Sequence, residues 1–113
     1  MTPLSLREAR CLFSQCLAEL ITWAIARGYQ IAIDEVTNHQ GTGHMKGSLH
    51  YEGLAADLNL YKDGVYLEKA EDHQSLGDQW KRIGQKYDAP LAWGGDFKSR
   101  DANHYSLSYG GKS

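Results

Sequence analysis

Two histidines and two aspartates occur at spacings that suit catalytic metal chemistry. Asp57 follows His50 by seven positions, and Asp101 precedes His104 by three. Two imidazoles and one carboxylate form the ligand set of a catalytic zinc ion that leaves its fourth position to water. A second carboxylate could act as general base toward that water. We therefore predict a hydrolase site in which His50, Asp57 and His104 bind zinc and Asp101 is the base.

These residues can meet only if the chain turns between His50 and Asp57. Gly53 permits such a turn, because glycine takes backbone angles that residues with a Cβ resist. We expect Asp57 on the strand after the turn and His104 on another strand of the same sheet. An aspartate buried in the apolar stretch 54–60 needs a cationic partner, which a metal ion would supply. For His50 taken alone, a structural role is as good an interpretation as a ligand role.

The N-terminal part of the chain predicts a long helix followed by a strand. Ser5 and Glu8 form a capping-box pattern, and apolar residues then recur at steps of three and four until Gly28. Gly28 is a typical left-handed C-cap. Alternating residues predict a strand over 29–36, and the aperiodic stretch 37–47 predicts a loop. Two histidines of this loop could be ligands or substrate contacts, or only polar loop residues: His39 and His44.

The second half of the chain predicts further strands and a second helix. The apolar stretch 54–60 predicts a strand, and Asp63-Gly64 predicts a hairpin turn after it. Apolar spacing predicts a helix that begins after Asp72, with His73 solvated in its first turn. An alternating strand over 104–109 completes the pattern. We predict one domain spanning residues 1–113 with an α+β fold: a small, mostly antiparallel sheet, a long N-terminal helix, a second helix, and a zinc site on the sheet.

Composition restricts the class of partner. The 113 residues carry a formal net charge of -2, which supplies no broad positive field for nucleic acid or an anionic membrane surface. We find no apolar run of membrane-spanning length and no secretory leader near the N-terminus, so we expect a cytoplasmic protein. Cys11 and Cys16 lie five positions apart on a predicted helix, where a disulfide is geometrically unfavourable. We expect two free thiols and a monomer.

The motif around the predicted ligands resembles a known peptidase superfamily. The pattern joins five positions to the later Asp101-x-x-His104: Ser48-x-His50-x-x-Gly53-x-Ala55-x-Asp57. It is similar to the zinc peptidases of the D-alanyl-D-alanine carboxypeptidase superfamily, which also includes phage L-alanyl-D-glutamate endopeptidases and the hedgehog signalling domain. Four further segments resemble the single-domain phage endolysin branch: Asp57–Tyr61, Leu76-Gly77, Trp93-Gly94-Gly95 and Asn103–Ser106.

The resemblance implies a substrate and a biological role. It implies zinc-dependent hydrolysis of a peptide bond in bacterial peptidoglycan, between L-alanine and D-glutamate of the stem peptide. An aspartate at position 101 favours the endopeptidases over the carboxypeptidases, which usually carry glutamate there. The implied role is host lysis by a phage-type endolysin, which reaches the wall after the membrane is permeabilised. Ser48 and Trp93 could contact the wall, although Ser48 could instead cap a turn and Trp93 could pack in the core.

One departure from the family pattern leaves alternatives open. Many relatives carry a substrate-binding arginine after the first strand, whereas 36–47 contains none. Gln40, Lys46 or Arg100 could replace it. A D,D-carboxypeptidase would need Lys46 or Arg100 to bind the terminal carboxylate of its substrate. A zinc-stabilised binding domain without turnover is the other alternative, but it would have no use for an acid at Asp101.

Overall fold

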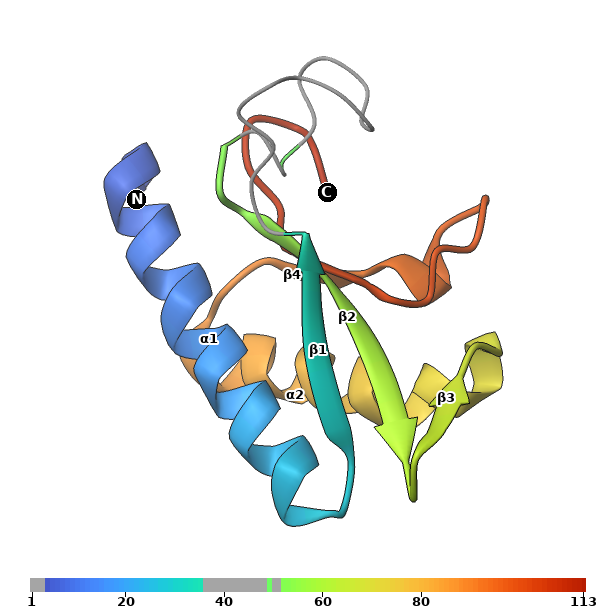
Figure 1. Cartoon of the computed structure of the whole chain (residues 1–113). Helices are drawn as coiled ribbons and strands as arrows, with labels where there is room; N and C mark the ends of the chain where they lie inside the picture. Colours follow the sequence, from blue (N-terminus) through green and yellow to red (C-terminus); the bar gives the residue numbers. More distant parts are fainter. Residues whose placement is uncertain (1–3, 36–48, 50–51) are drawn as a thin grey trace.

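The structure is a computed structural model that describes residues 4–35, 49 and 52–113 (Figure 1). The predicted loop over 37–47, with His39 and His44, lies outside the described residues. No helix in the described part of the chain is long and apolar enough to cross a membrane.

The long N-terminal helix α1 spans Leu6–Ala26 and begins with the predicted capping box. The backbone N–H of Glu8 donates to Ser5 Oγ at 3.1 Å, and the Ser5 N–H donates to Glu8 Oε1 at 2.9 Å. The helix stops before Gly28, whose φ of +90° is readily adopted only by glycine. One face of α1 is buried through residues at helical spacing: Ala9, Phe13, Cys16, Leu17, Leu20 and Ala24.

Five strands form one antiparallel sheet. Four of them follow the order β1-β2-β5-β4, and β3 pairs separately with the C-terminal end of β2. The hairpin between β2 and β3 turns at Asp63 and Gly64, which both have positive φ, as a two-residue type I′ turn requires. The strand bounds are Gln30–Glu35 (β1), Ala55–Lys62 (β2), Val65–Leu67 (β3), Leu91–Trp93 (β4) and His104–Leu107 (β5).

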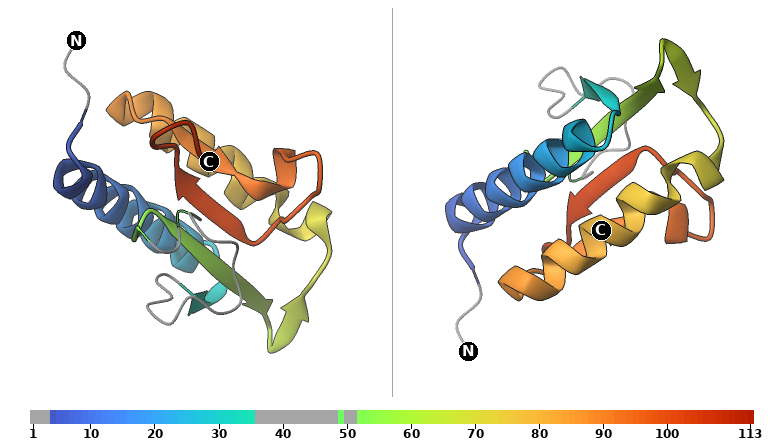
Figure 2. Two further views of the ribbon diagram at one scale, coloured as in Figure 1. Left: turned by 90° about the horizontal axis from the view of Figure 1, so that it is seen from above. Right: turned by 90° about the horizontal axis from the view of Figure 1, so that it is seen from below.

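The second helix, α2, spans Gln74–Tyr87 after a short 3-10 helix, η1, at Ala70–His73. Both helices pack on one face of the sheet (Figures 1 and 2). The core between them is aromatic, because the ring of Trp80 lies edge-on to Phe13 of α1 and to Tyr105 of β5, at centroid distances of 6.0 and 5.9 Å. The indole N–H of Trp80 reaches the carbonyl of Ala92 at 2.9 Å, which ties α2 to the sheet.

The predicted α+β fold is confirmed, as are the free thiols at Cys11 and Cys16. Two local predictions are wrong. All four residues of β5 are buried rather than alternating between buried and exposed, because both faces of this inner strand are covered. His73 is not solvated but only 3% exposed, and its Nε2 lies 3.0 Å from the carbonyl oxygen of Leu67.

Candidate metal and catalytic site

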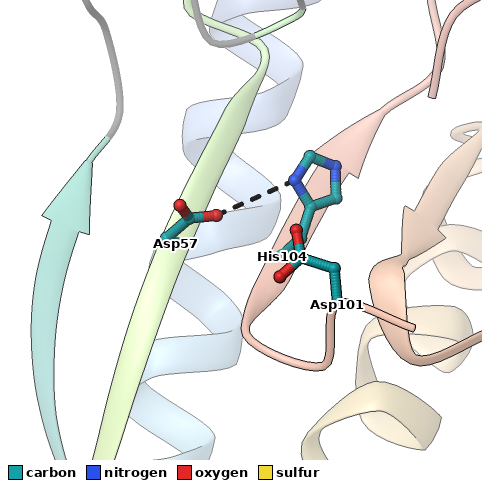
Figure 3. Close-up of side chains that lie close together, drawn as sticks. All are labelled: Asp57, Asp101 and His104. Carbon is teal, nitrogen blue, oxygen red and sulfur yellow. Dashed lines mark ion pairs between the residues drawn. The ribbon is translucent and has the colours of Figure 1, made fainter. Parts of the chain in front are cut away.

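The register of β2 and β5 places Asp57 directly opposite His104. Side chains of directly paired residues point to the same face of a sheet. Accordingly, Asp57 Oδ1 lies 3.8 Å from His104 Nδ1 (Figure 3). Both side chains are largely covered, at 17% and 9% exposure. The pairing therefore brings together two predicted ligands that lie in the two separate parts of the motif.

The alternation of β2 determines which face carries the site. Ala56, Leu58 and Leu60 are fully buried toward the helices, so Asp57 between them points to the other face. We call this face, turned away from α1 and α2, the site face. Figure 3 shows Asp57 and His104 in front of the two strands, with a helix behind them. Catalytic polar groups can thus gather here without disrupting the core.

Asp101 reaches the same place from the segment before β5. Its backbone N–H donates to the Gly94 carbonyl at 2.9 Å, and its own carbonyl accepts from the His104 N–H at 3.0 Å. These bonds hold an exposed side chain on a fixed backbone. Ligand atoms of Asp57, Asp101 and His104 lie within 4.8 Å of one another. Three of the four residues singled out for chemistry therefore form one cluster.

Gly94 makes this arrangement possible. It begins the short 3-10 helix η2, Gly94–Asp96. A Cβ at Gly94 would collide with the carbonyl oxygen of Asp101 and would lie 2.8 Å from the Cβ of His104. Only glycine lets η2 approach so closely. We infer that Gly94 positions both the aspartate and the histidine, a role that spacing along the chain could not indicate.

Phe97 is a second residue whose contact with the site was not predicted. Its half-buried ring lies 5.4 Å from the His104 imidazole, centroid to centroid, at a tilt of 53°. This contact restricts the orientation of the imidazole beside Asp57. The sequence signal was only the aromatic and glycine-rich composition of the segment from Trp93 to Phe97.

The donor set fits a zinc ion. Carboxylate oxygens and an imidazole nitrogen are ordinary zinc ligands. Two ligands bound tetrahedrally at about 2.0–2.1 Å stand about 3.4 Å apart, close to the 3.8 Å between Asp57 Oδ1 and His104 Nδ1. Small side-chain adjustments would bring both atoms into coordination. The cluster has therefore the composition and the spacing of a metal site.

Comparison with known proteins identifies the family. Residues 41–107, more than half of the chain, match a family of peptidases described as D-alanyl-D-alanine carboxypeptidase. The chain belongs to this carboxypeptidase family. The matched region includes all four residues predicted to carry the chemistry.

Among solved structures, this member of the carboxypeptidase family is similar to the Serratia marcescens L-Ala D-Glu endopeptidase ChiX, with a TM-score of 0.70. The similarity covers 85% of this chain and 77% of ChiX at 16% sequence identity, and it supports the fold. Among curated proteins, no sequence matches the chain.

Trp93, predicted either as a wall contact or as a core residue of this peptidase, lies in the core. It is 1% exposed, and its indole N–H donates to the Ala102 carbonyl at 2.6 Å. Its ring lies so close to Gly77 and Gly95 that a Cβ at either would collide with it. The predicted substrate contact is therefore corrected: Trp93 supports the segment that carries Asp101 rather than facing a ligand.

Two predicted site residues of the peptidase, Ser48 and His50, lie outside the described residues, so their roles stay predictions. The turn predicted at Gly53 is present, with φ of +73°. The backbone N–H groups of Glu52 and Leu54 donate to the carbonyl of the buried Leu49, at 3.1 and 2.9 Å.

Of the candidates for the missing arginine, only Arg100 is described. Its Nε donates to the Gly95 carbonyl at 2.9 Å, next to Asp101 in the chain. Gln40 and Lys46 lie outside the described residues. Arg100 thus provides a cation next to Asp101 in the chain.

Proposed function

We propose that this chain is a zinc-dependent endopeptidase that cleaves the bond between L-alanine and D-glutamate in peptidoglycan stem peptides. The observation that carries the proposal is the cluster of Asp57, Asp101 and His104 on the site face. Membership of the peptidase family supports hydrolysis of a peptide bond. The endopeptidase activity named for ChiX supports the choice of bond.

In this proposal Asp57 and His104, together with His50, would hold the ion. A zinc ion held there would lower the pKa of a water molecule toward about 7 and would polarise the scissile carbonyl. Asp57 and His104 lie on paired strands, so their ligand atoms are held in place before substrate arrives. Phe97 and Gly94 restrict the imidazole further.

Asp101 would act as the proton carrier. Its carboxylate would accept a proton from the attacking water and pass it to the nitrogen of the leaving amine, which completes hydrolysis. The side chain of Asp101 is exposed, whereas that of Asp57 is largely covered, with only 17% of its surface accessible. Exposure suits a group that must meet both water and substrate. The presence of Asp101 beside the candidate ligands also argues against a zinc site that serves only to stabilise the fold.

A D,D-carboxypeptidase is the second candidate, and the description of the matched family favours it. Such an enzyme must bind the free carboxylate of a terminal D-alanine, and Arg100 beside Asp101 offers a cation. The two activities differ in the bond that is cut, so product analysis separates them directly.

We further propose a lytic role of the phage endolysin type, in which the protein accumulates in the cytoplasm of the host bacterium and meets the wall after the membrane is permeabilised. This role rests on the resemblance of the motif and its flanking segments to that branch.

The deciding experiment is mass spectrometry of Gram-negative-type peptidoglycan digested with the purified protein, with metal content measured on the same sample. Release of stem peptides that begin at D-glutamate, abolished by a chelator and restored by zinc, is the expected result. Loss of terminal D-alanine alone would transfer the assignment to a carboxypeptidase. Zinc bound without any cleavage would favour the binding domain.

A further inference from the structure

The site face extends beyond the metal cluster along β2. Side chains at every second position of a strand share a face, so Asn59 and Tyr61 follow Asp57 in one row. Tyr61 is paired with Tyr66 of β3, and the centroids of the two rings lie 5.3 Å apart. The row therefore runs from the catalytic acids to an aromatic pair. Figure 1 shows β3 beside the C-terminal end of β2.

This aromatic pair differs from three other tyrosines that the structure describes. Tyr105 is fully buried, Tyr87 donates its hydroxyl to Glu19 at 2.6 Å, and the Tyr29 hydroxyl lies 3.1 Å from Ser75 Oγ. Each of these has a structural contact inside the fold. Tyr66 is 47% exposed, and Tyr61 beside it is half-buried. An exposed aromatic ring on the same face of the sheet as a candidate site is a feature of binding surfaces.

Polar groups connect the aromatic pair to the cluster. Asn59 lies between Asp57 and Tyr61 in the row, and its Oδ1 accepts from the Asn103 side chain at 3.4 Å. Asn103 immediately precedes His104, and its carbonyl accepts from the Leu58 N–H at 2.9 Å. Amide groups thus occupy the path between the catalytic acids and the two rings.

The spacing matches the substrate of the proposed function. Four residues of an antiparallel strand span about 13–14 Å. In peptidoglycan the stem peptide is attached to an amino sugar through a lactyl group, so one alanine and that linker separate the L-alanyl-D-glutamate bond from the sugar. This separation is roughly 7–10 Å when extended. A stem peptide aligned along β2 with its N-terminal end toward β3 would place the sugar ring beyond this linker at the aromatic pair.

We propose that Tyr61 and Tyr66 form a carbohydrate subsite that binds the amino sugar carrying the stem peptide. The apolar C–H faces of a sugar ring pack against the electron-rich face of an aromatic ring, and tyrosine adds a hydroxyl for hydrogen bonding. The inference rests on the proposed peptidase function, which places the peptide at Asp57 and Asp101. Its consequence is selectivity for stem peptides that are still attached to the glycan.

The test compares two substrates with one stem peptide: a disaccharide-linked peptide and the same peptide acetylated at its N-terminus without sugar. Tyr61→Ala and Tyr66→Ala should each lower kcat/KM for the sugar-bearing substrate by about 3- to 10-fold. On the sugar-free peptide they should change little. Val65→Ala is the matched control, because Val65 is 60% exposed on the same short strand but points to the opposite face.

A structural role for the rings would have a different signature. Cross-strand aromatic pairs also stabilise hairpins, and loss of that effect would lower activity on both substrates alike. Equal losses on the two substrates would therefore overturn the subsite, as would equal cleavage of both substrates by the unaltered protein.

A binding measurement separates failure of the subsite from failure of the proposed function. If the protein cleaves neither substrate, the endopeptidase proposal fails, and titration with the disaccharide alone then decides the subsite. Binding that is weakened in both tyrosine variants and kept in Val65→Ala supports it. Absence of disaccharide binding overturns it.

Discussion

The two halves of β2 differ in how they are packed and in what they carry. The N-terminal half lies between β1 and β5 and carries Asp57 opposite His104. The C-terminal half lies between β1 and the three-residue strand β3, and it carries Tyr61 beside the exposed Tyr66. One strand thus runs from an enclosed pair of candidate metal ligands to an aromatic pair of which Tyr66 is exposed.

The two halves of β2 suit two different tasks: positioning candidate metal ligands and presenting an exposed surface. Metal ligands need fixed positions, and a strand that is paired on both sides supplies them. A surface that binds a polymer must be accessible to solvent, and the short β2–β3 hairpin leaves its side chains accessible. Substitutions in the first half should therefore affect chemistry, whereas those in the second should affect substrate selection and stability.

The largest effect should come from His104→Gln in the enclosed half. Loss of the imidazole removes a ligand and the partner of Asp57, so zinc content should fall from about one ion per chain to near zero, with turnover at background. Metal analysis of dialysed protein beside a cleavage assay measures both. Retention of zinc and activity in a folded variant would remove His104 from the site.

Asp101→Asn should remove turnover but keep the metal. Loss of a general base costs about 10²- to 10⁴-fold in rate, whereas zinc content should match that of the unaltered protein. Asp96→Asn is the control, because Asp96 is an exposed carboxylate of the neighbouring η2 that pairs with Lys81 at 3.0 Å. Loss of zinc from Asp101→Asn would assign Asp101 as a ligand instead.

Gly94→Ala tests whether close approach of η2 positions the enclosed site. A Cβ there meets the Asp101 carbonyl and the His104 side chain, and overpacking of this kind costs about 1–3 kcal/mol. Gly84→Ala is a milder comparison away from the site, since its Cβ would lie 2.9 Å from the Ala89 carbonyl oxygen. We expect Gly94→Ala to destabilise the protein more than Gly84→Ala and to lose more activity than its lower stability accounts for. Equal activity in the two variants would limit Gly94 to packing.

The strands that carry Asp57 and His104, and two of the turns, were predictable from the sequence. Asp57 lies in an apolar stretch that predicts a strand, and His104 opens another. Residue types along the chain therefore predict that both lie on strands, whereas their meeting is predicted from the zinc ligand set that they would complete. The turn at Gly53 and the hairpin at Asp63-Gly64 followed from local backbone preferences. The strands and the two turns depend on neighbouring residues along the chain.

Features that depend on contacts between separate segments were not predictable. The burial of every residue of β5 depends on strand order, which no single segment encodes. The core position of Trp93 depends on Gly77 in α2, sixteen residues earlier in the chain. Gly94 and Phe97 affect the site because their segment packs against it: Gly94 lies against Asp101 and His104, and the ring of Phe97 lies against that of His104.

The smallest effect should come from His73→Gln, next to the hairpin half. Burial lowers the pKa of His73, although contacts with the Leu67 carbonyl and Asp72 raise it in part. The folded protein then binds a proton less readily than the unfolded chain, whose histidines titrate near about 6.5. The contribution of His73 to stability is therefore fully present above that pH and decreases as pH falls toward the lower pKa of the folded state.

Thermal unfolding between pH 7 and pH 5 should show a smaller decrease of Tm in His73→Gln than in the unaltered protein, with cleavage at pH 7 nearly unchanged. An identical decrease in both proteins would place the acid sensitivity elsewhere, and a large loss of cleavage would mean that the hairpin end of β2 is coupled to the site rather than separate from it.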